Sequence, residues 1–182
     1  FKNCRRIPKF CMGSNQKIFA IFQRLDKGIF EMPNTAKLEL LKCLVEQKLF
    51  QTIRASGFCY GVEFEYIQYR HYTLLKVITI FDSASYKKGV TKMIEHVADD
   101  FDKEFFDSTK TFYINNLPLH KETSLQNAQH YVDQASTYKV PPVLYDRFKE
   151  SIANLGLDEM NKFKNELFGR DKMATLRTKK ID

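Results

Sequence analysis

Candidate metal ligands are few in this sequence, and their spacing differs from that of a zinc site. Glu95-His96 matches the end of the inverted zinc motif His-x-x-Glu-His, but Lys92 stands where that motif needs its first His. Such a site requires two imidazoles one helical turn apart, and a Lys puts a cation in place of a ligand. The remaining histidines have no partner at ligand spacing. The sequence therefore predicts no metal site in this chain.

Other catalytic patterns are also missing from the sequence. It contains no Gly-rich phosphate loop and no Gly-x-Ser-x-Gly nucleophile motif. The four cysteines are widely spaced without a Cys-x-x-Cys pair: Cys4, Cys11, Cys43 and Cys59. Two of them fall on apolar patterns, where small buried thiols are common. We expect reduced structural thiols in a cytosol-like compartment, and no catalytic centre in this chain.

The segment from Ile53 to Val62 joins an amphipathic helix to an alternating strand and carries side chains that can bind a peptide. Arg54 falls at the helix end, Gly57 permits a sharp turn, and Tyr60 enters the strand. This arrangement places a guanidinium and a phenol on one rim of the sheet, where both can hydrogen-bond a carbonyl or a carboxylate. The residues also fit a structural role, in which Arg54 compensates the helix dipole and Tyr60 is an ordinary strand residue. Residue chemistry alone favours the structural interpretation.

Three segments have the pattern of strands that could position this rim. Residues 16–24 are rich in Phe and Ile and predict a largely buried strand. Residues 60–69 alternate between apolar and charged side chains, which is the pattern of a half-exposed strand. Residues 73–81 are more apolar and follow a turn, so an antiparallel hairpin is expected. The tail over 173–180 fits either a last strand or a frayed end.

Helical patterns account for most of the remaining chain. A first helix is expected from about Pro33 to Phe50, and a second one is expected to follow a cap at Asp82 or Ser83. The second helix is expected to bury Tyr86, Val90, Met93 and Val97 on one stripe. The other expected helices cover residues 102–116, 123–135, 142–155 and 157–169. A hairpin followed by a run of helices predicts an α+β fold, with a mostly antiparallel mixed sheet and helices packed on one face.

Length, composition and charge limit the number of domains and the kinds of partner that the sequence can have. The chain has 182 residues, of which 43% are hydrophobic, and this suits a single α+β domain over residues 1–182. Its net charge of +7 is scattered rather than concentrated, so no nucleic-acid partner is expected. No apolar run approaches the roughly 20 residues of a membrane span, so no membrane partner is expected. The first residue is not Met and the end is abrupt, which favours a fragment of a longer multi-domain chain.

One long segment resembles a known protein family. The run LLKCLVEQKLFQTIRASGFCYGVEF, residues 40–64, resembles the helix–loop–strand of the C-terminal domain in the pitrilysin/insulinase zinc metallopeptidases. The family pattern there is Leu/Ile-Arg, a few residues, then Gly-Leu-Ala/Gly-Tyr. This chain has Ile53-Arg54 and Gly57-Phe58-Cys59-Tyr60, one residue shorter than the commonest spacing, and is similar to a cytosolic eukaryotic branch. The resemblance extends over residues 16–169.

This resemblance implies a function that the residues alone do not. In that family, four related α+β domains form two halves that close around an unfolded peptide, and the last domain is catalytically inactive. The resemblance implies that Arg54 and Tyr60 bind the substrate, and that zinc and the catalytic base belong to the N-terminal half of the same protein. It implies a cytoplasmic hydrolase, with a mitochondrial one as the alternative. A non-catalytic scaffold or assembly subunit of the same fold is the alternative function.

Overall fold

The computed structural model describes residues 16–25, 32–68, 73–117, 132, 145–168 and 174–177. By its internal contacts the chain divides into two compact units. The sheet unit comprises Phe1–Leu25, Val45–Asp99 and Asn165–Asp182, and the helical unit comprises Asp26–Leu44 and Asp100–Lys164. The prediction of a single domain stays a prediction. No helix in the described ranges is long and apolar enough to cross a bilayer.

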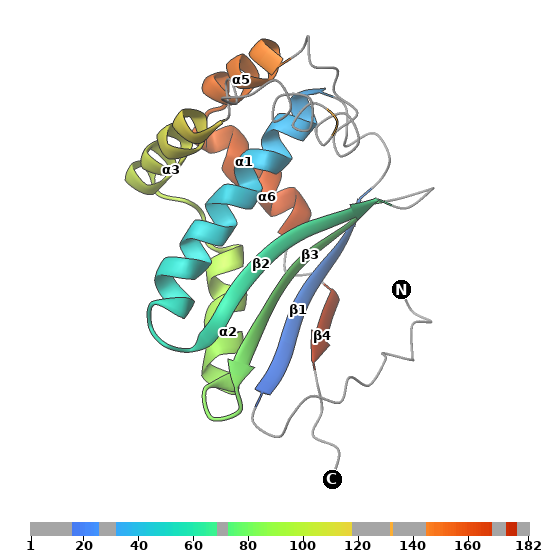
Figure 1. Cartoon of the computed structure of the whole chain (residues 1–182), viewed down its shortest axis with the longest axis vertical. Coiled ribbons are helices and arrows are strands. Elements are labelled where there is room, and N and C mark those ends of the chain that lie inside the picture. Colours follow the sequence, from blue (N-terminus) through green and yellow to red (C-terminus); the bar gives the residue numbers. More distant parts are fainter. Residues whose placement is uncertain are drawn as a thin grey trace. The chain divides into compact units, whose positions relative to one another are not determined.

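Four antiparallel strands form the sheet of the sheet unit, in the order β2-β3-β1-β4 (Figure 1). They are β1 (Gln16–Leu25), β2 (Cys59–Gln68), β3 (Thr73–Asp82) and β4 (Ala174–Arg177). The three predicted strands and the hairpin of β2 with β3 are confirmed. Of the two alternatives for the tail, the strand is the one observed, and it pairs with β1.

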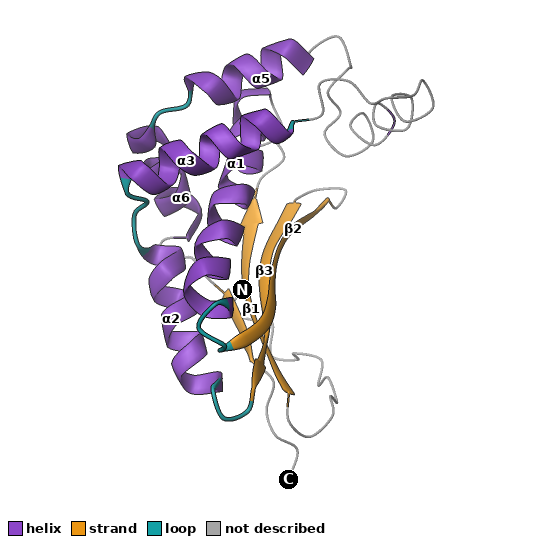
Figure 2. Cartoon of the chain, turned by 60° about the vertical axis from the view of Figure 1, so that its left-hand side comes forward, coloured by secondary structure: helices purple, strands orange, loops and turns teal. Residues whose placement is uncertain are grey.

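The two faces of this sheet differ in burial because side chains alternate along each strand. Phe19, Ile21, Val77 and Phe81 are fully buried on one face, whereas the intervening residues of β3 are only half-buried. Within the sheet unit, α2 (Tyr86–Ala98) lies on the buried face (Figure 2). Together with the helices of the chain, this arrangement confirms the predicted α+β fold.

Close packing of α2 on the sheet depends on Gly89. A Cβ at that position would lie 2.6 Å from Cδ1 of Phe81, which is closer than real Cβ contacts allow. The Phe81 ring also packs edge-on against Tyr86, with centroids 6.0 Å apart. Of the expected stripe, Val90, Met93 and Val97 are buried, whereas Tyr86 is half-buried. The sequence pattern therefore identified the correct face of this helix.

The cap of α2 differs from the prediction. The residue before the helix is Ser85, not Asp82 or Ser83, and its side chain makes no capping hydrogen bond. Asp82 ends β3 instead, and its carboxylate accepts a hydrogen bond from the Tyr60 hydroxyl across the strand pair. The Asp82 carboxylate, which the local sequence predicts as a helix cap, thus binds Tyr60 on a neighbouring strand instead.

The helical unit consists of helices. They are the first part of α1 (Met32–Leu49), α3 (Lys103–Asn116), α5 (Tyr145–Asn154) and most of α6 (Leu157–Phe168). Asp102 caps α3, accepting a hydrogen bond from the Phe105 backbone N–H at 2.9 Å. An ion pair of 2.7 Å joins Lys37 to Glu159. The helix expected over 123–135 lies outside the described residues apart from Val132, which is helical but exposed rather than inward-facing.

Candidate functional site

The predicted binding segment begins with a short π-helix that continues α1. This element, η2, spans Phe50–Arg54, and its end is closed by the Ala55 N–H, which donates to the Phe50 carbonyl at 2.9 Å. Ile53 is fully buried and fixes the segment to the core. Gly57 then adopts a φ of +74°, which favours glycine, and the chain turns into β2. Wider helical turns of this kind are frequent at functional sites.

Arg54 is the last residue of η2, and its side chain is exposed. Its guanidinium carbon lies 4.8 Å from the ring centroid of Phe50, which is itself 47% exposed. This is cation–π geometry, and it holds the guanidinium over the ring. Among the described residues Arg54 has no ion pair. Its hydrogen-bond donors are therefore available to a ligand.

Tyr60 lies at the start of β2, an edge strand, and is 56% exposed. Its hydroxyl donates to Oδ1 of Asp82 at 2.7 Å. The β2–β3 register shifts between Cys59 and Val62, and a shift of this kind re-aims the side chains around it. The structure thus places Arg54 and Tyr60 at the two ends of one loop and exposes both. Any carbonyl that bound here would compete with Asp82 for the hydroxyl proton.

Sequence reasoning missed the side chains that surround Phe58 in this loop. The Nζ atoms of Lys88 and Lys92, on α2, lie 5.2 Å and 5.0 Å from the centroid of the Phe58 ring. We call these three residues the Phe58 cluster. Lys88 and Lys92 are four residues apart, which puts them on one side of a helix, and this spacing was the available signal. The i, i+4 spacing of Phe50 and Arg54 was a similar signal.

The electrostatics near the end of α2 are set by several cations. Burial lowers the pKa of His96 below its usual 6.5, and Lys48 and Lys92 lower it further, against the opposing effect of Asp99. Lys48 also donates to the Asp99 carbonyl at 3.1 Å. Among the described residues no group of three or more His, Cys, Asp and Glu side chains is placed to hold a metal ion.

An acidic pair lies on the outward face of β2. A side-chain hydrogen bond to Glu65 raises the pKa of Glu63, and burial raises it further. Glu65 also forms an ion pair with Lys76 on the neighbouring strand β3. The ion pair with Lys76 therefore offsets only part of the negative charge of the two carboxylates.

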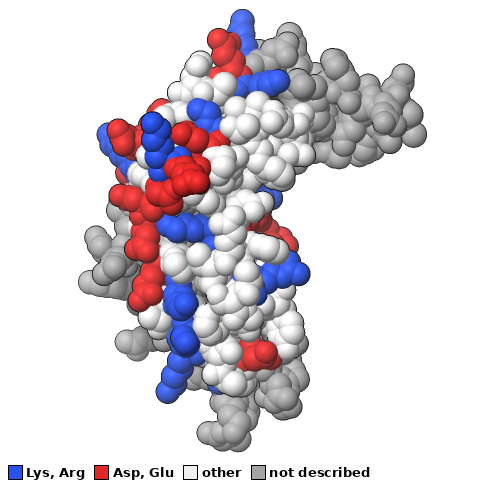
Figure 3. All heavy atoms as spheres, turned by 90° about the vertical axis from the view of Figure 1, so that its left-hand side faces the viewer, with Lys and Arg blue, Asp and Glu red and all other residues white. Residues whose placement is uncertain are grey.

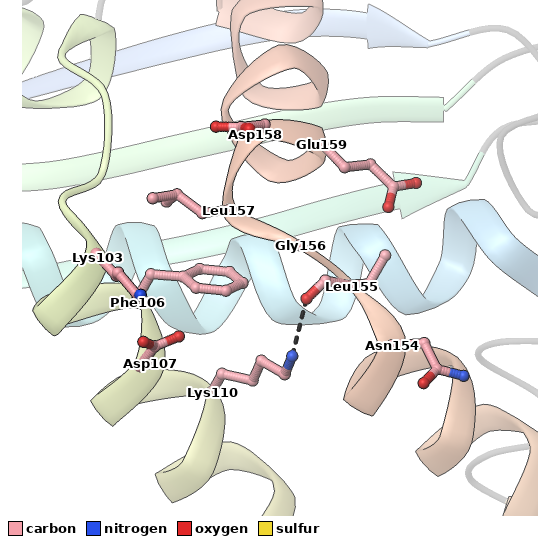
Figure 4. Close-up of a pocket in the computed structure, with 10 residues that line it drawn as sticks. All are labelled: Lys103, Phe106, Asp107, Lys110, Asn154, Leu155, Gly156, Leu157, Asp158 and Glu159. Atoms are coloured by element: carbon pink, nitrogen blue, oxygen red, sulfur yellow. Dashed lines mark hydrogen bonds between the residues drawn. The ribbon is translucent and has the colours of Figure 1, made fainter.

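The helical unit contains a hollow of about 650 Å³ where α3 approaches the turn between α5 and α6 (Figure 4). Lys110 crosses it and donates to the Leu155 carbonyl at 2.8 Å. Lys103 and Lys110 line the hollow together with Asp107, Asp158 and Glu159. Charges of both signs meet there, so its lining selects no ligand class.

The thiols are only partly as expected. Cys43 and Cys59 are free, and both are half-buried rather than fully enclosed. Cys4 and Cys11 lie outside the described residues.

Several solved structures share this fold. An inactive domain of peptidase M16 from Pseudomonas fluorescens matches 92% of this chain with a TM-score of 0.73 and 13% identity, over 42% of its own length. An inactive peptidase domain of a candidate zinc protease from Bordetella parapertussis matches 94% of the chain and 96% of its own length, with a TM-score of 0.70 and 10% identity. A protease from Helicobacter pylori matches 93% of the chain, with a TM-score of 0.71 and 12% identity, over 42% of its own length.

These likenesses are of fold, since the sequences are 10% to 13% identical. No family model matches the sequence, and no curated protein sequence is detectably similar. The chain spans 42% of the Pseudomonas and Helicobacter structures, so it corresponds to part of those proteins. All three are bacterial and give no support to the eukaryotic cytosolic branch predicted from the motif.

Proposed function

We propose that this chain is a catalytically inactive domain of a zinc peptidase of the M16 type, and that it contributes a peptide-binding surface to that enzyme. The observation that carries the proposal is the match to the Bordetella parapertussis inactive peptidase domain, which covers nearly all of both chains. The exposed Arg54 and Tyr60 occupy the loop where the family motif resembles this sequence. The peptide substrate, the zinc and the N-terminal half of the same protein are parts of this proposal.

Within such an enzyme the residues of this chain bind and orient the substrate. Arg54 carries several N–H donors with no ion pair among the described residues, so it is suited to a peptide carbonyl or to the oxygen that becomes negative during hydrolysis. Phe50 beneath the guanidinium limits its motion. A donor of this kind is worth about 2.7–4 kcal/mol in the barrier. Zinc held by the other half of such an enzyme would supply the activated water.

Binding of a labelled unfolded peptide to the purified chain tests the proposal. Arg54→Ala should weaken binding by about tenfold or more, as measured by fluorescence anisotropy. Arg147→Ala is the matched control, because Arg147 is also exposed but lies on α5 in the helical unit. In the full-length enzyme the Arg54 change should lower kcat/KM by about one to three powers of ten. Unchanged peptide binding in folded Arg54→Ala would contradict the proposal.

A further inference from the structure

The Phe58 cluster brings two ammonium groups to one aromatic ring. Lys88 and Lys92 lie one helical turn apart on α2, and both approach the ring of Phe58 within 5.2 Å. In Figure 3, Lys and Arg side chains form a row along the lower left of this face, whereas higher up they are mixed with Asp and Glu. A ligand seated beside Phe58 would therefore meet both charges at once.

The position of the ring is fixed by the backbone. The Phe58 N–H donates to the Ile53 carbonyl at 3.1 Å, and the Gly57 N–H donates to the Arg54 carbonyl at 2.9 Å. Ile53 is fully buried, so these bonds tie the loop to the core. α2 contacts η2 directly, which holds the lysines against the loop. The loop backbone that carries Phe58 is thus held in place, with α2 and its two lysines packed beside it.

Positive charge in the cluster is not balanced by acids. Neither lysine has an ion pair among the described residues. The acids nearest in sequence are Asp82, whose Oδ1 accepts from Tyr60, and Glu95 one turn beyond Lys92. Like charges four residues apart on a helix repel each other, and a bound anion would relieve that repulsion.

We propose that the Phe58 cluster binds the carboxylates of acidic segments in the peptide substrate, next to the loop that carries Arg54. This inference rests on the proposed function and specifies the substrate class. A peptide fits better than a nucleic acid, because the basic stretch of α2 ends at Glu95 and Asp99. A phosphate backbone requires a longer positive track.

The test uses two labelled peptides of equal length, one with a run of Glu and one with Gln at the same positions. The double variant Lys88→Gln/Lys92→Gln should weaken binding of the Glu peptide about tenfold and leave the Gln peptide unchanged. The control is Lys87→Gln/Lys162→Gln, which removes the same charge at two other exposed positions. Circular dichroism checks that each variant is folded.

Three outcomes would overturn the inference. Equal loss in the control would mean that net charge alone attracts the peptide. No loss in the double variant would mean that the cluster does not bind carboxylates. Tighter binding of a single-stranded oligonucleotide, with the same dependence on the two lysines, would mean that the ligand is a nucleic acid.

Failure of the inference can be told apart from failure of the proposed function. If Arg54→Ala weakens binding of both peptides while the double variant weakens neither, the acidic-segment inference fails and the proposed function stands. If Arg54→Ala has no effect while the double variant selectively weakens the Glu peptide, the cluster binds carboxylates but the proposed role of Arg54 is wrong.

Discussion

In the sheet unit, the core and the rim use aromatic side chains in opposite ways. Phe19, Phe64 and Phe81 are fully buried in the core, whereas Phe50 and Tyr60 at the rim are 47% and 56% exposed. The core rings pack against other rings, such as Phe64 edge-on to Phe168 with centroids 6.2 Å apart. At the rim, the Phe50 ring packs against the Arg54 guanidinium, and the Tyr60 hydroxyl donates to the Asp82 carboxylate. Aromatic residues therefore stabilise the fold in the core, whereas at the rim they contact exposed charged groups.

This difference separates stability from binding. A core ring contributes by being removed from water, which is worth a few kcal/mol for each large side chain. An exposed ring gains little from burial, and a cation–π contact at the surface is worth about 0.5–1 kcal/mol. Arg54 and the Phe58 cluster are thus placed where substitution leaves the fold intact. Core variants should therefore lower the free energy of unfolding much more than rim variants do.

Removing a core ring is expected to have the largest effect. Phe64→Ala should lower the free energy of unfolding by about 3–5 kcal/mol, because it leaves a cavity beside Phe168. The matched rim variant, Phe50→Ala, should change it by less than about 1 kcal/mol. Urea denaturation of both proteins checks the difference. Similar losses in the two variants would mean that Phe50 is a core residue and that the rim is structural.

The pH dependence of stability should report the burial of His96 and, to a lesser extent, the positive charge of Lys48 and Lys92. The pKa of His96 is lower in the folded protein than its usual 6.5, so between the two values the unfolded chain binds more protons. Stability should therefore be greatest above pH 6.5 and should fall as the pH drops through 6.5 towards the folded pKa. His96→Gln should remove this part of the pH dependence, as measured by urea denaturation between pH 5 and 8. A change in the opposite direction would mean that Asp99 outweighs burial and the lysines.

Regular patterns made much of the fold predictable from sequence. The stripe of Leu38, Leu41, Val45 and Leu49 is buried and could be predicted, because a helix repeats its apolar face every three to four residues. Strand alternation likewise identified β2, and an apolar run after a turn identified β3 and the hairpin. The exposure of Arg54 followed from its place after this stripe. These features depend on local periodicity, and a single sequence is enough to reveal it.

Features set by distant partners were not predictable. Asp82 was assigned to a helix cap, yet Tyr60, 22 residues earlier, takes its carboxylate. The approach of Lys88 and Lys92 to Phe58 depends on how α2 packs on the η2 loop, which no local pattern encodes. The π-helical continuation of α1 replaces an expected helix end. The side-chain contacts at the rim therefore depend on tertiary packing more than on the local sequence motif.

The smallest change in stability is expected for Tyr60→Phe. The lost hydroxyl donates to Asp82 at 2.7 Å, but both groups lie in an exposed setting, where such a bond contributes about 1 kcal/mol or less. Because Asp82 competes for the hydroxyl proton, Tyr60→Phe should weaken peptide binding less than Arg54→Ala does. Asp82→Ala removes that competitor and leaves Tyr60 in place, so it should maintain or strengthen binding at a similar cost in stability. If both variants lose stability equally and neither alters peptide affinity, then Tyr60 serves only to join β2 to β3, and the rim binds peptides through Arg54 without it.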